Sequence, residues 1–331
     1  MLKLMNLSTY NYDLERFNFQ SDQITKFLEK HNMDGVELLN PIMWEESILP
    51  KGIVKGVHLK YYPTWLDFWK SDKNELLRQF KTEDIIEQYY SGNSRKVMIQ
   101  HYRKEIEAAA KIGVKYMVFH VAHVEVEHAY DYNFTYSDND IADAAIDLIN
   151  QAFEGVDTDI ELLFENMWWP GFTMLDKKVA LRLLNEVEYK NKGFILDISH
   201  LMNTNLYLKD EKEAVQYIIN TVKKLGDLKN LIKGIHLNSS LSGEYVRSQI
   251  RKKEKENKEF DLNPLSEEVF MHVFKIDCHK PFKDKNIQQV IDFINPKYLI
   301  YELVADSIEQ LEEYIEIQDS ACGKDVDFLH I

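Results

Sequence analysis

Histidine is rare in this chain, with 11 residues in 331, yet five histidines stand at or just beyond the ends of short apolar segments. Four carboxylates occupy equivalent places. Imidazole and carboxylate groups are the usual ligands of first-row divalent metals, so their convergence in the fold would form a metal site. The nine residues are His58, His120, Glu165, Asp197, His200, His236, Asp277, His279 and Glu302.

A single residue of this set says little, because a lone histidine at a strand end is more often a hydrogen-bonded structural residue than a ligand. Several carboxylates that converge in a low-dielectric pocket repel one another and are costly to desolvate unless a cation binds between them. Mixed imidazole and carboxylate ligands favour Zn or Mn, with Fe, Co or Mg as alternatives, whereas Ca prefers oxygen ligands alone. Cys278 lies between Asp277 and His279, and alternation along an extended segment points its thiol away from them.

The elements that must position these residues alternate regularly along the chain. Short apolar segments bounded by turn residues are followed by amphipathic stretches with helical spacing, as at Ile218, Ile219 and Val222. Eight such pairs in about 300 residues predict a closed (β/α)8 TIM barrel, whose strands all end at one mouth. An open doubly wound sheet is the alternative, but no G-x-G-x-x-G follows the first strand. The predicted strands are KLMNLSTY, GVELLNP, VKGVHLKYYP, VKYMVFHVA, DIELLFENM, GFILDIS, IKGIHLNSS and YLIYELVA.

Two stretches depart from this alternation. MWEESILPKG, after the second strand, is a short connection rather than a clear helix. Residues 241–275 are a helical insertion between strand seven and helix seven, in which basic residues are matched by nearby acidic ones. Long excursions in compact domains are often functional, so we treat this insertion as a possible lid over the mouth. We therefore expect one barrel domain over residues 1–331.

The composition narrows the class of protein further. Hydrophobic residues make up 45% of the chain, which is enough for a large core, and 12 Gly with 7 Pro argue against disorder. No apolar run reaches the roughly 18 residues of a membrane helix, and the start of the chain shows no signal peptide. The two cysteines, Cys278 and Cys322, give no disulfide framework, so a cytoplasmic location is expected, without a membrane partner.

The formal net charge of −15 bears on the partners of the protein. Proteins that grip duplex DNA usually carry a basic stripe that displaces counterions from phosphates. The acidic balance therefore argues against nucleic acid, without excluding it, and favours a small-molecule substrate. The aromatic residues that follow Glu165 suggest a carbohydrate-like compound. Barrels of this type often pair, so a homodimer is an alternative to a monomer.

The motifs FHVAH, FENMWWPG, LDISH, GIHLN, DCHKP and YELV, in this order, resemble the xylose isomerase-like barrel superfamily. That superfamily includes sugar isomerases and epimerases as well as endonuclease IV. The resemblance covers nearly the whole chain, with residues 241–275 as an added segment. As an ordered set the motifs are specific, although no single one is.

The resemblance implies two kinds of site. The endonuclease IV pattern has three metals and nine ligands, and the chain offers a residue of the right type at each of the nine positions given above. Resemblance to this pattern implies a multinuclear zinc centre that hydrolyses a phosphodiester. The isomerase and epimerase pattern uses one metal held by Glu165, Asp197, His236 and Glu302. Glu165 and Glu302 would move protons beside a metal-polarised carbonyl, while His200 holds a substrate oxygen.

Two departures from the nuclease pattern favour a metal-dependent isomerase or epimerase of a small sugar, polyol or keto-sugar. No loop carries clustered Arg and Lys, and bulky Trp168 and Trp169 follow Glu165 where the nuclease pattern has small residues. Aromatic faces suit sugar rings, so Trp168, Trp169 and His123 are predicted to bind substrate. Packing of the tryptophans under a loop is the other interpretation, and a multinuclear zinc phosphodiesterase of the endonuclease IV type is the alternative function.

Overall fold

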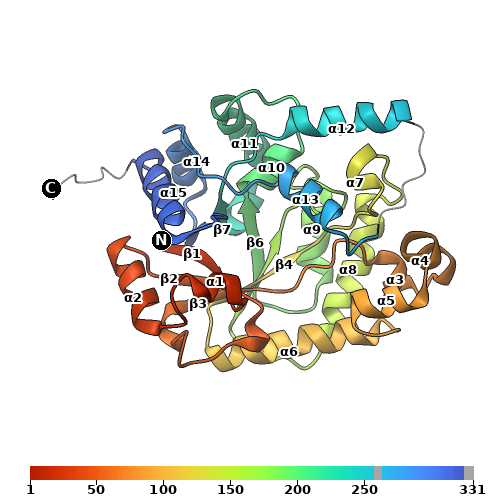
Figure 1. The fold of residues 1–331 in the computed structure, drawn as a ribbon, viewed down its shortest axis with the longest axis horizontal. Coiled ribbons are helices and arrows are strands. Elements are labelled where there is room, and N and C mark those ends of the chain that lie inside the picture. Colours follow the sequence, from red (N-terminus) through yellow and green to blue (C-terminus); the bar gives the residue numbers. More distant parts are fainter. Residues whose placement is uncertain (257–262, 324–331) are drawn as a thin grey trace.

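The computed structural model describes residues 1–256 and 263–323. Within these ranges eight parallel strands pair in chain order and β8 pairs with β1, so the sheet closes into a barrel surrounded by helices (Figure 1). The predicted (β/α)8 barrel is confirmed over the open sheet. The strands are β1 Leu2–Ser8, β2 Gly35–Leu39, β3 Val54–His58, β4 Tyr116–His120, β5 Glu161–Glu165, β6 Lys192–Asp197, β7 Ile232–Leu237 and β8 Tyr298–Tyr301.

Helices follow most of the strands, and several begin at a side-chain cap. Ser137 and Asp140 form a capping box at the start of α8, and Asp210 caps α11. Between β2 and β3 the chain makes only two 3-10 turns, Pro41–Met43 and Lys51–Ile53, as MWEESILPKG suggested. The helices that cover the barrel include α2 Ser21–Lys30, α6 Lys96–Ile112, α8 Asp138–Ala152, α9 Lys177–Glu186, α11 Glu211–Leu225, α14 Ile287–Ile294 and α15 Ile308–Ala321. Short helices in the connections are α1 Asn11–Glu15, α3 Leu66–Lys70, α4 Lys73–Phe80, α5 Glu83–Tyr90, α7 His128–Asp131 and α10 Ile198–Asn203.

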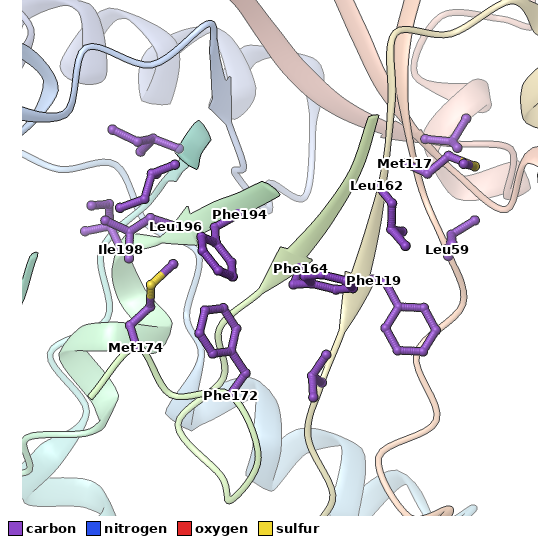
Figure 2. Close-up of a cluster of buried hydrophobic side chains, with 14 of the residues drawn as sticks. Leu59, Met117, Phe119, Leu162, Phe164, Phe172, Met174, Phe194, Leu196 and Ile198 are labelled. Carbon is purple, nitrogen blue, oxygen red and sulfur yellow. The ribbon is translucent and has the colours of Figure 1, made fainter. Parts of the chain in front are cut away.

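Side chains at alternate strand positions point outward and form the main core between sheet and helices. Figure 2 shows part of this core, where Phe119, Leu162, Phe164 and Phe194 lie together on three neighbouring strands. Each of these side chains is at most 4% exposed. Burial on this scale fixes which face of every strand turns outward, and so fixes which residues point into the barrel.

The intervening positions point into the barrel, where a separate apolar cluster fills the interior: Leu4, Tyr116, Val118, Leu163, Ile195, Tyr298 and Ile300. Two residues further along their strands stand His120, Glu165 and Asp197. The same period of two leads to His236 on β7 and to Glu302 just after β8. These five candidate ligands therefore form the last inward-facing layer, at the C-terminal end where barrel enzymes hold their active sites.

Gly56 on β3 makes room for the ring of Tyr116. A Cβ built on Gly56 would lie 2.2 Å from Cζ of Tyr116, much closer than van der Waals contact. We expect Gly56→Ala to destabilise the barrel by about 1–3 kcal/mol, because the buried ring must shift. Thermal denaturation measures this as a lower Tm. Gly52→Ala is the control, since a Cβ there meets nothing within 4 Å. Equal Tm values for the two variants would show that the ring has space to move.

The segment between β7 and α14 carries two further helices, α12 Gly243–Glu256 and α13 Glu267–Ile276. Figure 1 shows α12 beside α7, and Lys253 Nζ lies 2.6 Å from Asp131 Oδ2 there. His272 on α13 stacks on Tyr130, with ring centroids 3.6 Å apart, and bonds to the carbonyl of Ala129. The helices are thus anchored to the loop after β4. A lid role stays a prediction, and residues 257–262 of the predicted insertion and 324–331 of the predicted domain lie outside the described residues.

None of the described helices combines the length and the apolar character needed to cross a membrane.

Candidate metal centre

A pocket of about 450 Å³ opens at the C-terminal ends of the strands. Six of the nine predicted ligands line it: His58, His120, His200, Asp277, His279 and Glu302. The other three, Glu165, Asp197 and His236, are completely buried. All nine therefore meet at one end of the barrel, as the strand-end argument predicted.

The nine side chains form three groups, and within each group the ligand atoms lie within 4.8 Å of one another. Glu165 belongs to two of the groups and so links them. The groups are His58, His120 and Glu165; then Glu165, Asp197, His236 and Glu302; and then His200, Asp277 and His279.

The two carboxylate oxygens of Glu165 face different histidines. Its Oε2 lies 2.9 Å from His58 Nε2 and 3.2 Å from His120 Nε2. Its Oε1 lies 3.1 Å from His236 Nδ1 and 3.3 Å from His200 Nδ1. A carboxylate placed in this way can bind one cation through each oxygen.

The second group is completed around His236. Its Nδ1 lies 3.2 Å from Glu302 Oε2 and 3.9 Å from Asp197 Oδ2. Asn238, two residues along the chain, donates from Nδ2 to Asp197 Oδ2 at 2.9 Å. The other oxygen of Asp197, Oδ1, accepts from the backbone N–H of His200 at 2.7 Å and so caps α10, which leaves Oδ2 as the oxygen that faces His236.

Asp277 is the centre of the third group. Its Oδ2 lies 3.1 Å from His200 Nε2 and 2.6 Å from His279 Nε2. Its other oxygen, Oδ1, accepts a hydrogen bond from Ser199 Oγ at 2.7 Å. One carboxylate oxygen therefore faces both imidazoles, and the hydroxyl fixes its orientation.

The tautomers of the histidines indicate which nitrogens are free to bind a cation. Nδ1 of His58 lies 3.0 Å from the carbonyl of Leu59, and Nδ1 of His200 lies 2.8 Å from the carbonyl of Asn166. A carbonyl only accepts, so both rings carry a proton on Nδ1. The other nitrogen, Nε2, faces the carboxylates and can bind a cation once it has lost its proton. A metal-bound histidine has the same arrangement, with its second nitrogen donating to a backbone or carboxylate oxygen.

The pKa values show how these charges are balanced without a cation. Burial lowers the pKa of His58, but its hydrogen bond to Glu165 and the charges of Glu165 and Glu37 together outweigh burial and raise the pKa to about 9. Burial likewise lowers the pKa of His279, but the negative charges of Asp277 and its neighbours outweigh burial and raise the pKa to about 9. Burial, with help from neighbouring carboxylates, raises the pKa of Glu302 to about 7. The cluster thus holds protons where cations would otherwise bind.

Three buried polar residues belong to the site although the sequence analysis did not single them out. Glu37 on β2 is completely buried, and its Oε1 lies 3.0 Å from His236 Nε2. Asn166 bonds to the backbone of Asp197 through both ends of its amide, at 2.9 and 3.0 Å, and Asn238 fixes the carboxylate of the same residue. The available signal for Glu37 was a single acidic residue inside the apolar segment GVELL.

Aromatic side chains form part of the pocket wall beside the ligands. Both Trp168 and Trp169 line the pocket. The Trp168 ring centroid lies 5.0 Å from that of His200, and the Tyr61 ring lies 4.5 Å from that of His120. Substrate contact by the tryptophans stays a prediction, but their positions are compatible with it.

His123 does not lie among the residues that line this pocket. Its Nδ1 accepts hydrogen bonds from the backbone N–H groups of Trp65 and Leu66, at 3.1 and 3.2 Å. Burial lowers its pKa to about 3, so the ring is neutral with its proton on Nε2. Ligand atoms of Asp67 and Glu125 lie within 4.8 Å, but an Nε2–H group offers no lone pair to a cation. His123 therefore supports the loop after β3 in this structure.

Residues 88–297 match a family described as a xylose isomerase-like TIM barrel. Endonuclease IV from Thermus thermophilus is similar with a TM-score of 0.52 and 13% identity, over 98% of this chain and 100% of that one. AsfvAP, in the structure designated AsfvAP:AG, is similar with a TM-score of 0.53 and 12% identity, over 97% of this chain and 98% of that one. A D-tagatose 3-epimerase-like protein has a TM-score of 0.48 and 16% identity, over 97% of this chain and 99% of that one. At these identities the likeness shows the fold alone. No curated protein sequence matches this chain significantly.

Proposed function

This chain belongs to the xylose isomerase-like TIM barrel family, and on that premise we propose that its nine-residue cluster is a multinuclear metal centre that hydrolyses a phosphoester. The observation that carries the proposal is the completeness of three adjoining ligand groups, two of which share Glu165. A reaction with one metal would use only four of the nine side chains, those of the second ligand group. Burying the remaining imidazoles and carboxylates would then be a desolvation cost without a purpose. We therefore place phosphoester hydrolysis first, although the sequence favoured an isomerase or epimerase.

The donor set fits Zn or Mn best, because five imidazoles are too many for a hard, oxygen-seeking ion such as Mg. Bound divalent ions would stabilise charge on phosphoryl oxygens and lower the pKa of an attacking water. The chain itself supplies Glu165 to join two ligand groups and Asn238 to orient Asp197. Tyr61 and Trp168 border the ligands and would exclude bulk water.

A small phosphoester suits the pocket better than a nucleic acid. A volume of about 450 Å³ lies in the range of sites for small molecules. The net charge of −15 opposes the counterion displacement on which duplex binding depends. A small substrate is thus retained from the sequence analysis, but with a phosphoester in place of a plain sugar.

A sugar isomerase or epimerase is the second candidate, and the ionisation of two glutamates favours it. The pKa of Glu302 is raised to about 7, mainly by burial. Burial also acts to raise the pKa of Glu165, but its contacts with His120 and His236 outweigh burial and hold that pKa well below its usual range. Two carboxyl groups whose pKa values differ in this way can serve as acid and base. We rank this function second because it uses only one ligand group.

Two assays distinguish the candidates. Protein reconstituted with Zn or Mn is incubated with p-nitrophenyl phosphate, bis(p-nitrophenyl) phosphate and an abasic duplex, and separately with a panel of sugars in heavy water. We expect hydrolysis of a small ester, in which water oxygen bonds to phosphorus as the P–O bond to the leaving alcohol breaks. Deuterium incorporation into a sugar without any hydrolysis would favour the second candidate. Cleavage of the duplex alone would contradict the small substrate.

Zinc binding should release protons and tighten as pH rises. The pKa values of His58 and His279 are about 9 without metal, so both rings are protonated at pH 7 and must lose a proton to become ligands. Apparent affinity should therefore increase from pH 7 towards pH 9 and level off above it. Calorimetric titration in two buffers of different ionisation enthalpy counts the protons, and about two or more per chain are expected at pH 7. Binding without proton release would contradict this assignment.

A further inference from the structure

Glu37 is a buried carboxylate that touches the site from the barrel interior, yet it is not one of the nine predicted ligands. It lies on β2 in register with Asn6 and Gly56, and its partner His236 lies on β7. Strands β1 and β8 separate these two in the sheet, so the contact crosses the inside of the barrel. Both residues are completely buried, and Glu37 Oε1 and Oε2 lie 3.0 and 3.2 Å from His236 Nε2.

Within the described part of the chain, His236 is the imidazole that is left to pair with Glu37. His58 lies nearby, but its two nitrogens are already directed at the Leu59 carbonyl and at Glu165. Nδ1 of His236 faces Glu165 and Glu302, so its Nε2 remains for Glu37. A neutral imidazole that offers the Nδ1 lone pair to a cation carries its proton on Nε2. Glu37 is therefore placed to accept a hydrogen bond.

We propose that Glu37 is a positioning residue, which fixes the orientation and tautomer of His236 so that Nδ1 faces the second ligand group. The role rests on the proposed metal centre. A carboxylate behind the imidazole makes Nδ1 a stronger ligand, and loss of such a partner typically costs about 10- to 100-fold in metal affinity. Without Glu37 the buried Nε2–H would also be left without an acceptor, and the ring would be free to turn.

Two substitutions separate the hydrogen bond from the charge. Glu37→Leu keeps a side chain of similar size but removes the hydrogen-bond acceptor, and we expect zinc affinity to fall about 10- to 100-fold. Glu37→Gln keeps a carbonyl oxygen that can accept from Nε2 but removes the charge, so an intermediate loss is expected. Affinity is measured by competition with a fluorescent zinc chelator, and the retained ions are counted by elemental analysis. The Nε2–H proton resonance of His236 should survive in Glu37→Gln and disappear in Glu37→Leu.

Asp67→Asn is the matched control, since Asp67 is another buried carboxylate, outside the pocket, and accepts from Gln79 at 2.7 Å. It should lower Tm without changing zinc affinity. Wild-type affinity and ion count in both Glu37 variants would overturn the proposal. If the wild type binds zinc but hydrolyses nothing, only the proposed reaction fails and the Glu37 comparison still decides its role. If the wild type binds no zinc, the metal centre fails and this role fails with it.

Discussion

Glu165→Gln should reduce phosphoester hydrolysis by about 1000-fold or more and should remove at least one bound ion. Glu165 is the only one of the nine candidate ligands that contacts four of the histidines, two through each carboxylate oxygen. The amide is neutral and replaces one of these oxygens by an NH2 group, which donates hydrogen bonds and does not bind a cation. A thousandfold loss corresponds to about 4 kcal/mol of transition-state stabilisation, which is within the contribution of a metal centre.

The control for this variant is Glu161→Gln, the same substitution at the other end of the same strand. Glu161 lies at the start of β5, where it contacts Lys297 at 2.8 Å and accepts from the Tyr298 hydroxyl at 2.8 Å. Residues at this end of a barrel contribute to stability rather than to catalysis. We expect kcat/KM and ion content within about twofold of wild type, with at most a lower Tm. A Glu165→Gln protein that keeps full activity and a full set of ions would remove the basis for a shared ligand.

The second prediction separates hydrolysis from isomerisation. Asp277→Asn changes the third ligand group only, because Asp277 Oδ2 is the oxygen that faces both His200 and His279. We expect the protein to lose one ion and hydrolysis to fall about 100-fold or more, through loss of one ion's electrostatic contribution. An isomerase that uses only the second group would keep its single ion, and its activity would fall only as far as the loss of the Asp277 contact disturbs His200. Steady-state kinetics on both reactions, with ion content measured on the same samples, makes the comparison.

Asp284→Asn is the control for this loop substitution. Asp284 lies in the same connection before α14 and accepts from the backbone of Asn286 at 2.8 Å, away from the ligand groups. Its variant should keep the wild-type ion content. If Asp277→Asn loses no ion and keeps full hydrolysis, the third group does not take part and a smaller centre must be assumed.

The fold and the ligand set were predictable because both follow from the period of the strands. Burial of residues such as Phe164 and Phe194 between sheet and helices fixes the outward face, so Glu165 must point inward. The strand ends are marked in the sequence by turn residues and by the change from apolar to polar side chains. Period and strand end together were sufficient for the six candidate ligands that lie on a strand or directly after one. The other three lie beyond the strand ends, His200 in α10 and Asp277 and His279 before α14, and were included for their residue types.

Glu37 escaped this reasoning for a physical reason. It stands in the middle of β2, so a rule that examines only the last residues of each strand does not consider it. Its role depends on His236 across the barrel, a contact between strands that are not neighbours and that no local pattern encodes.

His123 shows the opposite error: the sequence analysis placed it at the substrate, but the structure places it outside the pocket. It follows β4 by three residues, and beyond a strand end the alternation of inward and outward positions no longer holds. Ala122 instead pairs with Gly171, and His123 turns to the backbone of Trp65. Which nitrogen of a histidine is free depends on such contacts, so the sequence alone cannot separate it from the five histidines of the site.

The most direct test of the central claim, that the nine side chains hold more than one cation, is to count the ions. Protein purified without chelator, supplied with Zn or Mn and then dialysed, is analysed for metal by elemental analysis against its concentration. The account predicts two or three tightly bound ions per chain, with their positions at the three ligand groups visible by anomalous diffraction. A single ion per chain, or none, would contradict it.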